Sequence, residues 1–363
     1  MSLSCGIVGL PNVGKSTIFN ALTNAGAESA NYPFCTIDPN VGVVHLHDSR
    51  LDKLGKIVGA AKTIFATVEF VDIAGLVKGA SKGEGLGNKF LANIRETNAI
   101  AHVIRCFDDE NIVHVEGSVS PTRDADIINT ELLIADLEAL EKRHLRESKV
   151  ARSGDKDAKA MLVIIERMME ALNDGLPART VEVSKEEEPL AHTLHLITRK
   201  PMLYVANTAD PTEENEYVAQ VRDMAVKEGA NVVVLSGKME AEIMEIEEDE
   251  ERAMFLEELG LTETGLDRLA HSAFNLLGLQ TYFTAGEKEA RSWTIRQGWK
   301  APQAAGVIHT DFEKGFIKAE IYSCNDMFDL GSEAALKSAG KMRLEGKDYV
   351  MQDGDVVEFR FNV

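Results

Sequence analysis

The residues best suited to chemistry lie near the amino end of the chain, in the segment Gly9 to Ser16. Its sequence, GLPNVGKS, fits the pattern G-x-x-x-x-G-K-S/T, in which glycines let main-chain N–H groups close around a phosphate. In this pattern Lys15 reaches the β- and γ-phosphates, and the Ser16 hydroxyl binds Mg²⁺. The residues predicted to hold the nucleotide here are Asn12, Val13, Gly14, Lys15, Ser16 and Thr17.

A second group of residues supplies ligands for the metal and a contact to the γ-phosphate. Asp72 and Gly75 form a D-x-x-G pattern at the end of an apolar run. An aspartate so placed holds Mg²⁺, usually through water, and the glycine N–H can meet the γ-phosphate. Thr36 is the expected second hydroxyl on the metal. We therefore predict a Mg²⁺ site made by Ser16, Thr36 and Asp72, with Lys15, Asp72 and Gly75 as catalytic residues.

The spacing of apolar residues indicates the elements that must position these motifs. In the first third, short β-rich runs alternate with helical patterns, which is typical of a parallel sheet covered on both faces. From about Ile127 the pattern becomes helical, and two amphipathic helices joined near Ser153 and Gly154 indicate a hairpin. Strand character then returns at 202–206, so the hairpin is predicted to be an insertion. The last ~85 residues have the texture of a separate small β-rich domain.

Composition excludes several classes of protein. The 363 residues carry a net charge of −20 and are 44% hydrophobic, which indicates a folded acidic protein rather than a disordered tail or a general polyanion binder. Neither an apolar leader nor an apolar run of about 18 residues is present in the sequence. The four cysteines are too widely spaced for a zinc knuckle or a redox pair. We therefore predict a cytoplasmic protein that does not bind membranes.

These motifs, together with the segment His309 to Glu320, closely resemble those of the YchF family, the Obg-like ATPases. The resemblance covers nearly the whole chain. It implies an α/β fold of the P-loop NTPase type with a mostly parallel sheet, an inserted helical coiled-coil hairpin and a C-terminal, ubiquitin-like β-grasp domain called TGS. The implied boundaries are 1–125 and 198–277 for the nucleotide-binding domain, 126–197 for the insertion and 278–363 for TGS. Ribosome association and a preference for ATP over GTP are also implied.

The segment expected to read the base carries two opposing signals. GTPases use N-K-x-D, in which Asn meets the base edge, Lys packs over the base and Asp accepts from two guanine donors. Here the sequence from Asn207 to Asp210 is NTAD, so Thr208 replaces the Lys while the carboxylate is kept. Asn207, Asp210, Ser236 and Gly237 are the candidate base contacts. We favour ATP, because backbone groups can read adenine if Asp210 points away, and GTP is the alternative.

Hydrolysis is predicted to be slow. Related GTPases often place a Gln after D-x-x-G to orient the attacking water, and this chain has Leu76 there. Asn12 resembles the asparagine that coordinates K⁺ in potassium-dependent relatives, which makes K⁺ a candidate cofactor beside Mg²⁺. His114, in a loop after a strand, is the candidate catalytic residue that positions water or stabilises charge. A turn-stabilising Asn12 and an ordinary loop histidine are the alternatives.

Basic residues gather in two segments despite the negative net charge, which allows a local RNA surface. They are Lys142, Arg143, His144, Arg146, Lys149 and Arg152 in the first long helix, and Arg291, Arg296, Lys300, Lys314 and Lys318 near the C-terminus. Trp293, Trp299 and Phe316 are candidate stacking residues, with solvated faces and core aromatics as the alternatives. The leading hypothesis is a slow, Mg²⁺-dependent NTPase switch that binds the ribosome or RNA. A P-loop kinase, and an adaptor that recruits proteins through TGS, are the alternatives.

Overall fold

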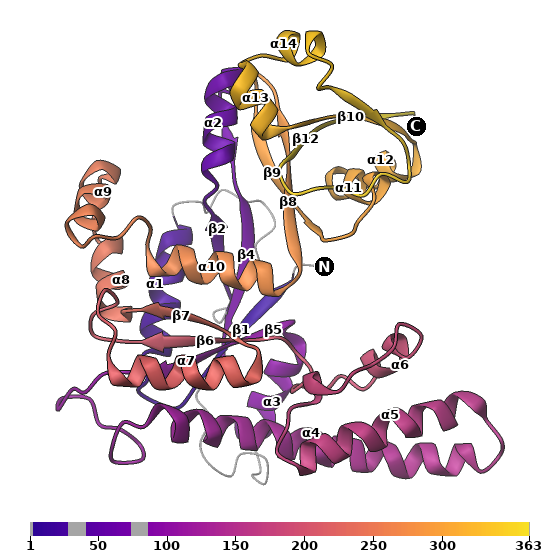
Figure 1. Cartoon of the computed structure of the whole chain (residues 1–363). Coiled ribbons are helices and arrows are strands. Elements are labelled where there is room, and N and C mark those ends of the chain that lie inside the picture. Colours follow the sequence, from indigo (N-terminus) through magenta and orange to yellow (C-terminus); the bar gives the residue numbers. More distant parts are fainter. Residues whose placement is uncertain (1–2, 28–40, 74–85, 363) are drawn as a thin grey trace. The chain divides into compact units, whose positions relative to one another are not determined.

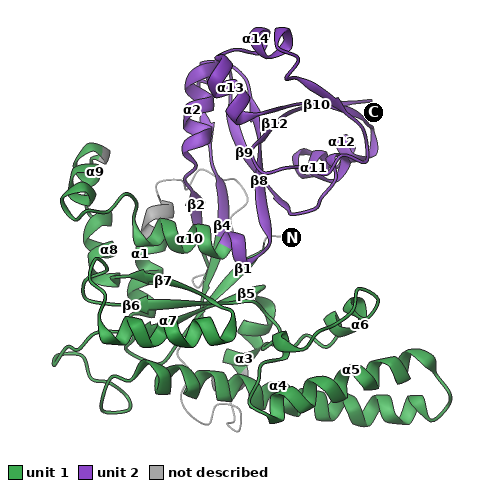
Figure 2. Ribbon diagram, in the orientation of Figure 1, with its two compact units in different colours: residues 1–43, 69–273 green, residues 44–68, 274–363 purple. Residues whose placement is uncertain are grey.

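A computed structural model describes residues 3–27, 41–73 and 86–362. The chain forms two compact units, one of residues 1–43 and 69–273 and the other of residues 44–68 and 274–363 (Figure 2). The chain crosses between the units three times, inside strands β2 (Val41–Leu46) and β4 (Ala66–Asp72) and inside helix α10 (Gly265–Leu276). The predicted boundaries assign all of residues 1–125 to the nucleotide-binding domain. In the structure, residues 44–68 group with the C-terminal segment instead.

The first unit is built on a six-stranded sheet with the order β2-β4-β1-β5-β6-β7 (Figure 1). Strand β1 pairs in parallel with β4 and β5, and β6 pairs in parallel with β5 and β7. Every residue of β5 and β6 is buried, as expected for strands covered on both faces. The predicted α/β fold with a mostly parallel sheet is confirmed. The further strands are β1 (Ser4–Val8), β5 (Ala99–Arg105), β6 (Met202–Asn207) and β7 (Asn231–Leu235).

Helices follow the strands of this sheet, so the segments that leave its carboxyl ends meet at one edge. The predicted phosphate loop lies between β1 and α1 and therefore belongs to this edge, as do the last residue of β4 and the turns after β6 and β7. Among the described helices, none is both long and apolar enough to cross a membrane. The helices are α1 (Lys15–Ala27), α3 (Leu86–Glu96), α7 (Glu216–Glu228), α8 (Gly237–Met244), α9 (Asp249–Glu258) and α10 (Gly265–Leu276).

The predicted helical hairpin is present between β5 and β6. It consists of α4 (Pro121–Ala151) and α5 (Lys156–Asn173), and the turn between them includes Ser153 and Gly154, as the sequence predicts (Figure 1). A short 3₁₀ helix η1 (Ala178–Thr180) and helix α6 (Glu188–His192) lead back to the sheet. One apolar core joins these elements, formed by Leu140, Met161, Ile164, Ile165, Met168, Leu172, Ala178, Ala191 and Leu196.

A buried carboxylate fixes the end of the insertion to helix α4. Asp136 is fully buried and accepts hydrogen bonds from Ile197 N at 3.0 Å, Thr198 N at 2.7 Å and Thr198 Oγ1 at 2.7 Å. Burial raises the pKa of Asp136, and these hydrogen bonds oppose that rise. Because a buried charge is tolerated only when it is well hydrogen-bonded, this contact fixes where the segment before β6 begins.

The second unit has its own six-stranded sheet, with the order β11-β10-β12-β8-β9-β3. It also holds four short helices near the C-terminus, which the prediction of a small β-rich domain did not include. Each has five to eight residues, too few to give a clear helical period in the sequence. Its elements are α2 (Ser49–Val58), β3 (Thr63–Ile64), β8 (Leu279–Ala285), β9 (Ala290–Arg296), α11 (Ala301–Ile308), α12 (Thr310–Lys314), β10 (Phe316–Ser323), α13 (Cys324–Leu330), α14 (Glu333–Ser338), β11 (Arg343–Glu345) and β12 (Asp355–Phe361).

The predicted stacking aromatics belong to the packing of this second unit. Phe316 is buried in its core, so the prediction that it offers a stacking surface is wrong. Trp293 and Trp299 are partly buried and pack against the same core. The indole N–H of Trp293 donates to Thr284 Oγ1 at 2.9 Å, and the Arg291 guanidinium lies 4.1 Å from the Trp293 ring. The core therefore explains these aromatic residues without RNA.

Candidate functional site

Two glycines allow the loop between β1 and α1 to close. Gly9 has a φ of 154°, and a Cβ at this position would lie 2.5 Å from the Val103 carbonyl oxygen. Gly14 has a φ of 99°, and a Cβ there would collide with the side-chain amide of Asn207. Both backbone conformation and close approach therefore require glycine, as the phosphate-loop pattern predicts.

Lys15 is folded back across the loop that precedes it. Its side chain is buried, and Nζ donates to the Leu10 carbonyl oxygen at 2.6 Å. Burial lowers the pKa of Lys15 to about 8, although the charge of Asp72 opposes this shift. Within the described residues, the ammonium of this buried lysine donates to one carbonyl and contacts no carboxylate directly, so it could pair with a phosphate.

The described metal candidates lie close to Lys15 in the fold. Asp72 ends β4, and its backbone is in register with Ile7 of β1, two residues before the loop begins. Burial raises the pKa of Asp72, and the charge of Lys15 opposes that rise. Ser16 and Thr17 are exposed at the start of α1. The other two predicted residues here, Thr36 and Gly75, lie outside the described residues.

Asn207 links the phosphate loop to the turn after β7. Its Nδ2 donates to the Val13 carbonyl oxygen at 2.9 Å, and its Oδ1 accepts from Gly237 N at 2.9 Å. Ser236 caps helix α8, because its hydroxyl accepts from Met239 N at 3.4 Å. The structure thus brings Asn207 and Gly237 next to the phosphate loop. The hydrogen bond from Asn207 to Val13 fixes the position of the Asn207 side chain, and the base-reading pattern does not specify this bond.

The other two polar residues of the base segment, Thr208 and Asp210, form hydrogen bonds with neighbouring residues of the protein. Thr208 is buried, donates from its N to the Leu235 carbonyl oxygen at 2.9 Å and accepts from Asn215 Nδ2 at 3.0 Å. Asp210 is exposed and accepts from Thr212 Oγ1 at 2.6 Å and from Thr212 N at 2.8 Å. These bonds lower the pKa of Asp210. The Asp210 carboxylate therefore closes a local turn.

His114 is held by a contact that the sequence analysis missed. Its Nε2 lies 2.9 Å from Asp124 Oδ2, and its Nδ1 accepts from Glu116 N at 3.1 Å. Since Nδ1 accepts, Nε2 carries the proton and donates to Asp124. Both ring nitrogens are thus in use, in a side chain that is 5% exposed. The sequence offered one indication of this partner: Asp124 is an acidic residue in the first turn of α4, where the helix dipole favours a negative charge.

The loop that carries His114 contacts the phosphate loop. Asn12 has a left-handed backbone with φ of 61°, and its Nδ2 donates to the Val113 carbonyl oxygen at 3.1 Å. The fully buried Arg105 stabilises the same loop, because its guanidinium donates hydrogen bonds to the carbonyl oxygens of Phe107, at 3.0 Å, and Ile112, at 2.9 Å. The phosphate loop is therefore linked, through this one loop, to helix α4.

Comparisons with known proteins agree with this arrangement. A family model described as "50S ribosome-binding GTPase" matches residues 4–134, and one named YchF-GTPase_C, described as "Protein of unknown function (DUF933)", matches residues 279–362. Two relatives named "Ribosome-binding ATPase YchF", from Bacillus subtilis and Escherichia coli O157:H7, are 57% and 56% identical over the full length of both chains. A solved structure, the YchF GTPase of Schizosaccharomyces pombe, has a TM-score of 0.90 and 40% identity, covering 99% of this chain and 98% of that one.

Proposed function

Because the chain belongs to the YchF family, we propose that it is a nucleoside triphosphatase that hydrolyses ATP and binds the ribosome as a nucleotide-dependent switch. The observation that carries the proposal is the buried Lys15, whose Nζ donates to the Leu10 carbonyl oxygen at the turn where two glycines bring the backbone together. Full-length similarity to relatives that are named ribosome-binding ATPases supports both the substrate and the partner.

The donors available for a metal fit Mg²⁺. They are hard oxygen ligands, the Ser16 hydroxyl and the Asp72 carboxylate, and Mg²⁺ in such sites takes its other ligands from phosphates and water. When bound, Mg²⁺ neutralises charge on the β- and γ-phosphates. Thr36 and Gly75 complete the proposal as a second hydroxyl ligand and a γ-phosphate contact. K⁺ is proposed at Asn12, whose Nδ2 is used by Val113 while its amide oxygen can face a cation.

His114 is proposed as the residue that orients water or stabilises charge during hydrolysis. In this structure its Nε2 donates to Asp124, so this role requires the ring to leave that carboxylate. Such a requirement agrees with slow turnover in the absence of a partner. If His114→Ala hydrolyses ATP as fast as the wild-type protein, in the presence and absence of ribosomes, the role is lost. Asp124→Asn, which weakens the hold on the ring but keeps its shape, serves as the comparison.

ATP is proposed as the preferred nucleotide, and GTP is the second candidate. The family model described as a GTPase favours GTP, as does the carboxylate retained at Asp210. The contact of that carboxylate with Thr212 favours ATP, because a group that closes its own turn is not directed at guanine. Asn207, Ser236 and Gly237 are then the residues proposed to contact the base.

The ribosome is the proposed partner, and a cytoplasmic location is proposed with it. RNA contacts are proposed at the basic end of α4, where Lys142 and Lys149 are exposed, as is Arg152 directly after the helix. Arg143 is less available, because it forms an ion pair with Glu147 at 2.9 Å. The TGS segment is a proposed site for protein partners.

The experiment is competitive titration of ATP against GTP on the full chain, combined with phosphate release and with co-sedimentation on ribosomes. We expect tighter binding of ATP, slow release of inorganic phosphate, and ribosome binding that differs between ATP-analogue and ADP. Transfer of phosphate to an acceptor would indicate a kinase instead. Ribosome binding that ignores the nucleotide, in an Asp72→Asn protein without turnover, would indicate an adaptor.

A further inference from the structure

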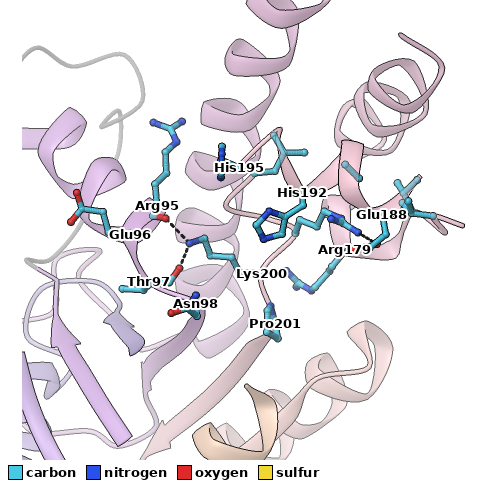
Figure 3. A pocket seen from close by; sticks show the side chains of 15 residues that line it. Arg95, Glu96, Thr97, Asn98, Arg179, Glu188, His192, His195, Lys200 and Pro201 are labelled. Atoms are coloured by element: carbon cyan, nitrogen blue, oxygen red, sulfur yellow. Dashed lines mark hydrogen bonds and ion pairs between the residues drawn. The ribbon is translucent and has the colours of Figure 1, made fainter. Parts of the chain in front are cut away.

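The opposite edge of the first sheet, where β5 and β6 begin, contains a cavity of about 530 Å³ (Figure 3). It opens between the last residues of α3, the segment from η1 to α6 and the residues just before β6. This volume is in the range of small-molecule sites and is larger than one phosphate ion needs. The phosphate loop lies at the other edge of the sheet, so this cavity belongs to a different place in the unit.

Basic side chains dominate the charge of this cavity, which we call the basic cavity. Four basic and two acidic residues line it, in a chain whose net charge is −20. A local excess of positive charge in an acidic protein creates a field that attracts anions. The basic residues are Arg95, Arg179, Arg199 and Lys200, and the acidic residues are Glu96 and Glu188.

Only part of this positive charge is neutralised by the protein. Arg199 pairs with Glu188 at 2.6 Å, and Arg179 pairs with Glu228 at 2.9 Å. The guanidinium of Arg95 has neither an ion pair nor a hydrogen bond within the described part of the chain, and it is exposed. A free guanidinium with five donors in a planar fork is matched by the oxygens of a phosphate group.

Lys200 adds a second charge that no carboxylate meets directly. Its Nζ donates to the main-chain carbonyl oxygens of Arg95, at 2.8 Å, and of Thr97, and so caps the end of α3 (Figure 3). These bonds use two of the three N–H groups of the ammonium. Burial lowers the pKa of Lys200 to about 8, Asp136 opposes this shift, and the charge of Arg95 adds to it. A bound anion would remove the repulsion between the two cations.

Two histidines complete the wall. His192 and His195 are exposed, and their rings meet edge to face with centroids 5.9 Å apart (Figure 3). His195 has a left-handed backbone with φ of 49°, a conformation that costs energy in a residue other than glycine. Two and three residues later, the backbone N–H groups of Ile197 and Thr198 donate to buried Asp136, which fixes the chain after this strained residue. The fold therefore holds these imidazoles, which are hydrogen-bond donors, in the same cavity as Arg95 and Lys200, neither of which contacts a carboxylate directly within the described residues.

We propose that the basic cavity is a binding site for a small phosphate-bearing ligand, separate from the nucleotide at the phosphate loop. Phosphate is the favoured anion because its oxygens match the donors that line the basic cavity, which include the guanidinium of Arg95 and the remaining N–H group of Lys200. A small molecule is favoured over an RNA strand because the cations surround one cavity rather than forming a stripe along which a backbone could run. The same phosphate chemistry on an RNA strand is distinguished by experiment.

The test titrates inorganic pyrophosphate, by calorimetry, into the full chain saturated with Mg²⁺ and a nonhydrolysable ATP analogue. Wild type is compared with Arg95→Gln and with the matched control Arg222→Gln, which removes an exposed arginine from α7, outside the cavity. Loss of one charged hydrogen-bonding partner is expected to weaken pyrophosphate binding about tenfold or more in Arg95→Gln. Arg222→Gln is expected to bind like wild type, and both variants should keep the unfolding temperature and ATP turnover of wild type.

Each other outcome overturns the assignment. Equal pyrophosphate affinity in wild type and Arg95→Gln would exclude the basic cavity as the site, as would absence of binding. A parallel titration uses a short single-stranded RNA. If RNA binds in an Arg95-dependent way and pyrophosphate does not, the cavity serves an RNA strand, and the small-molecule assignment is wrong. ATP turnover and ribosome co-sedimentation, measured on the same samples, show separately whether the proposed function holds.

Discussion

The two edges of the sheet in the first unit gather polar side chains in different ways. At the carboxyl edge, Lys15 and Asn207 come from segments that directly follow or end a strand, and each is hydrogen-bonded to nearby main chain. At the amino edge, the basic cavity draws its cations from the end of α3, from η1 and from the residues before β6. Local backbone geometry thus builds the first site, and tertiary packing builds the second.

This difference predicts how each edge responds to mutation. Lys15 has a carbonyl partner, so its removal takes away the proposed phosphate contact and leaves the fold with one unsatisfied acceptor. Asp136, which anchors the segment beside the basic cavity, accepts from three donors, and these lose a buried acceptor when it is removed. We therefore expect substitutions at the carboxyl edge to lower nucleotide turnover and substitutions at the amino edge to lower the free energy of unfolding.

The largest expected effect is that of Lys15→Ala. Removing a positioned cation from a phosphate site costs about 10²–10³-fold in turnover, by analogy with the loss of one preorganised donor. Phosphate release under saturating ATP measures this loss, and calorimetry measures nucleotide binding. Lys227→Ala, on the exposed face of α7, is the matched control. Wild-type turnover in Lys15→Ala would mean that the carboxyl edge is not the nucleotide site.

Asp136→Ala is expected to act on the free energy of unfolding instead. Each buried donor left unsatisfied costs about 1–3 kcal/mol, so a loss of about 3 kcal/mol is expected for this group. Denaturant unfolding measures the change. Asp157→Ala, an exposed aspartate in the first turn of α5, should cost less than about 1 kcal/mol. If the two variants are equally stable, the insertion is not anchored by Asp136, and the contrast between the edges disappears.

The same contrast explains what the sequence could and could not predict. Gly9, Gly14 and Lys15 were found because a short pattern encodes a local backbone shape that few other residues allow. The contact between His114 and Asp124, and the buried Arg105 beneath the loop, depend on how a strand, a loop and a helix meet, which no spacing reveals.

The fold follows the same division. The parallel sheet was predicted from short, near-continuous apolar runs such as that of β5. The helical hairpin was predicted because a helical apolar period extends over many residues in α4 and α5. The grouping of residues 44–68 with the C-terminal segment was not predicted, since a strand that passes between units, such as β2, has an ordinary strand sequence. The basic cavity was missed for a related reason, because its cations are spread over more than 100 residues.

A smaller effect is expected from pH, and it sharpens the description of the carboxyl edge. The pKa of Lys15 is lowered to about 8 by burial, so the protonated fraction in the free protein falls about tenfold between pH 7 and pH 9. Because phosphate binds the protonated form, nucleotide binding takes up a proton, and affinity should fall by a similar factor over this range. Titrations at several pH values measure it. Lys15→Arg, which stays charged, should show a nearly flat profile, and an equal slope in both proteins would locate the titrating group elsewhere.

The smallest expected effect is that of replacing Asp210. This substitution tests whether every residue of the base-reading segment contacts the nucleotide. The carboxylate is exposed and accepts two hydrogen bonds from Thr212, so its loss should loosen a surface turn rather than a base contact. We expect Asp210→Ala to change the ratio of ATP to GTP affinity by less than about threefold, which corresponds to about 0.6 kcal/mol. Competitive titration of the two nucleotides measures the ratio.

A different result at Asp210 would identify a different nucleotide. If the carboxylate turns to the base when nucleotide binds, it would accept from two guanine donors, and its removal would leave those donors unpaired in a partly closed site. GTP affinity would then fall at least tenfold while ATP affinity stayed the same or rose. Thr212→Val, which removes the hydroxyl donor but keeps the carboxylate, separates the two cases. It would free Asp210 to turn toward guanine, and so raise GTP affinity, only if the turn competes with the base for this carboxylate.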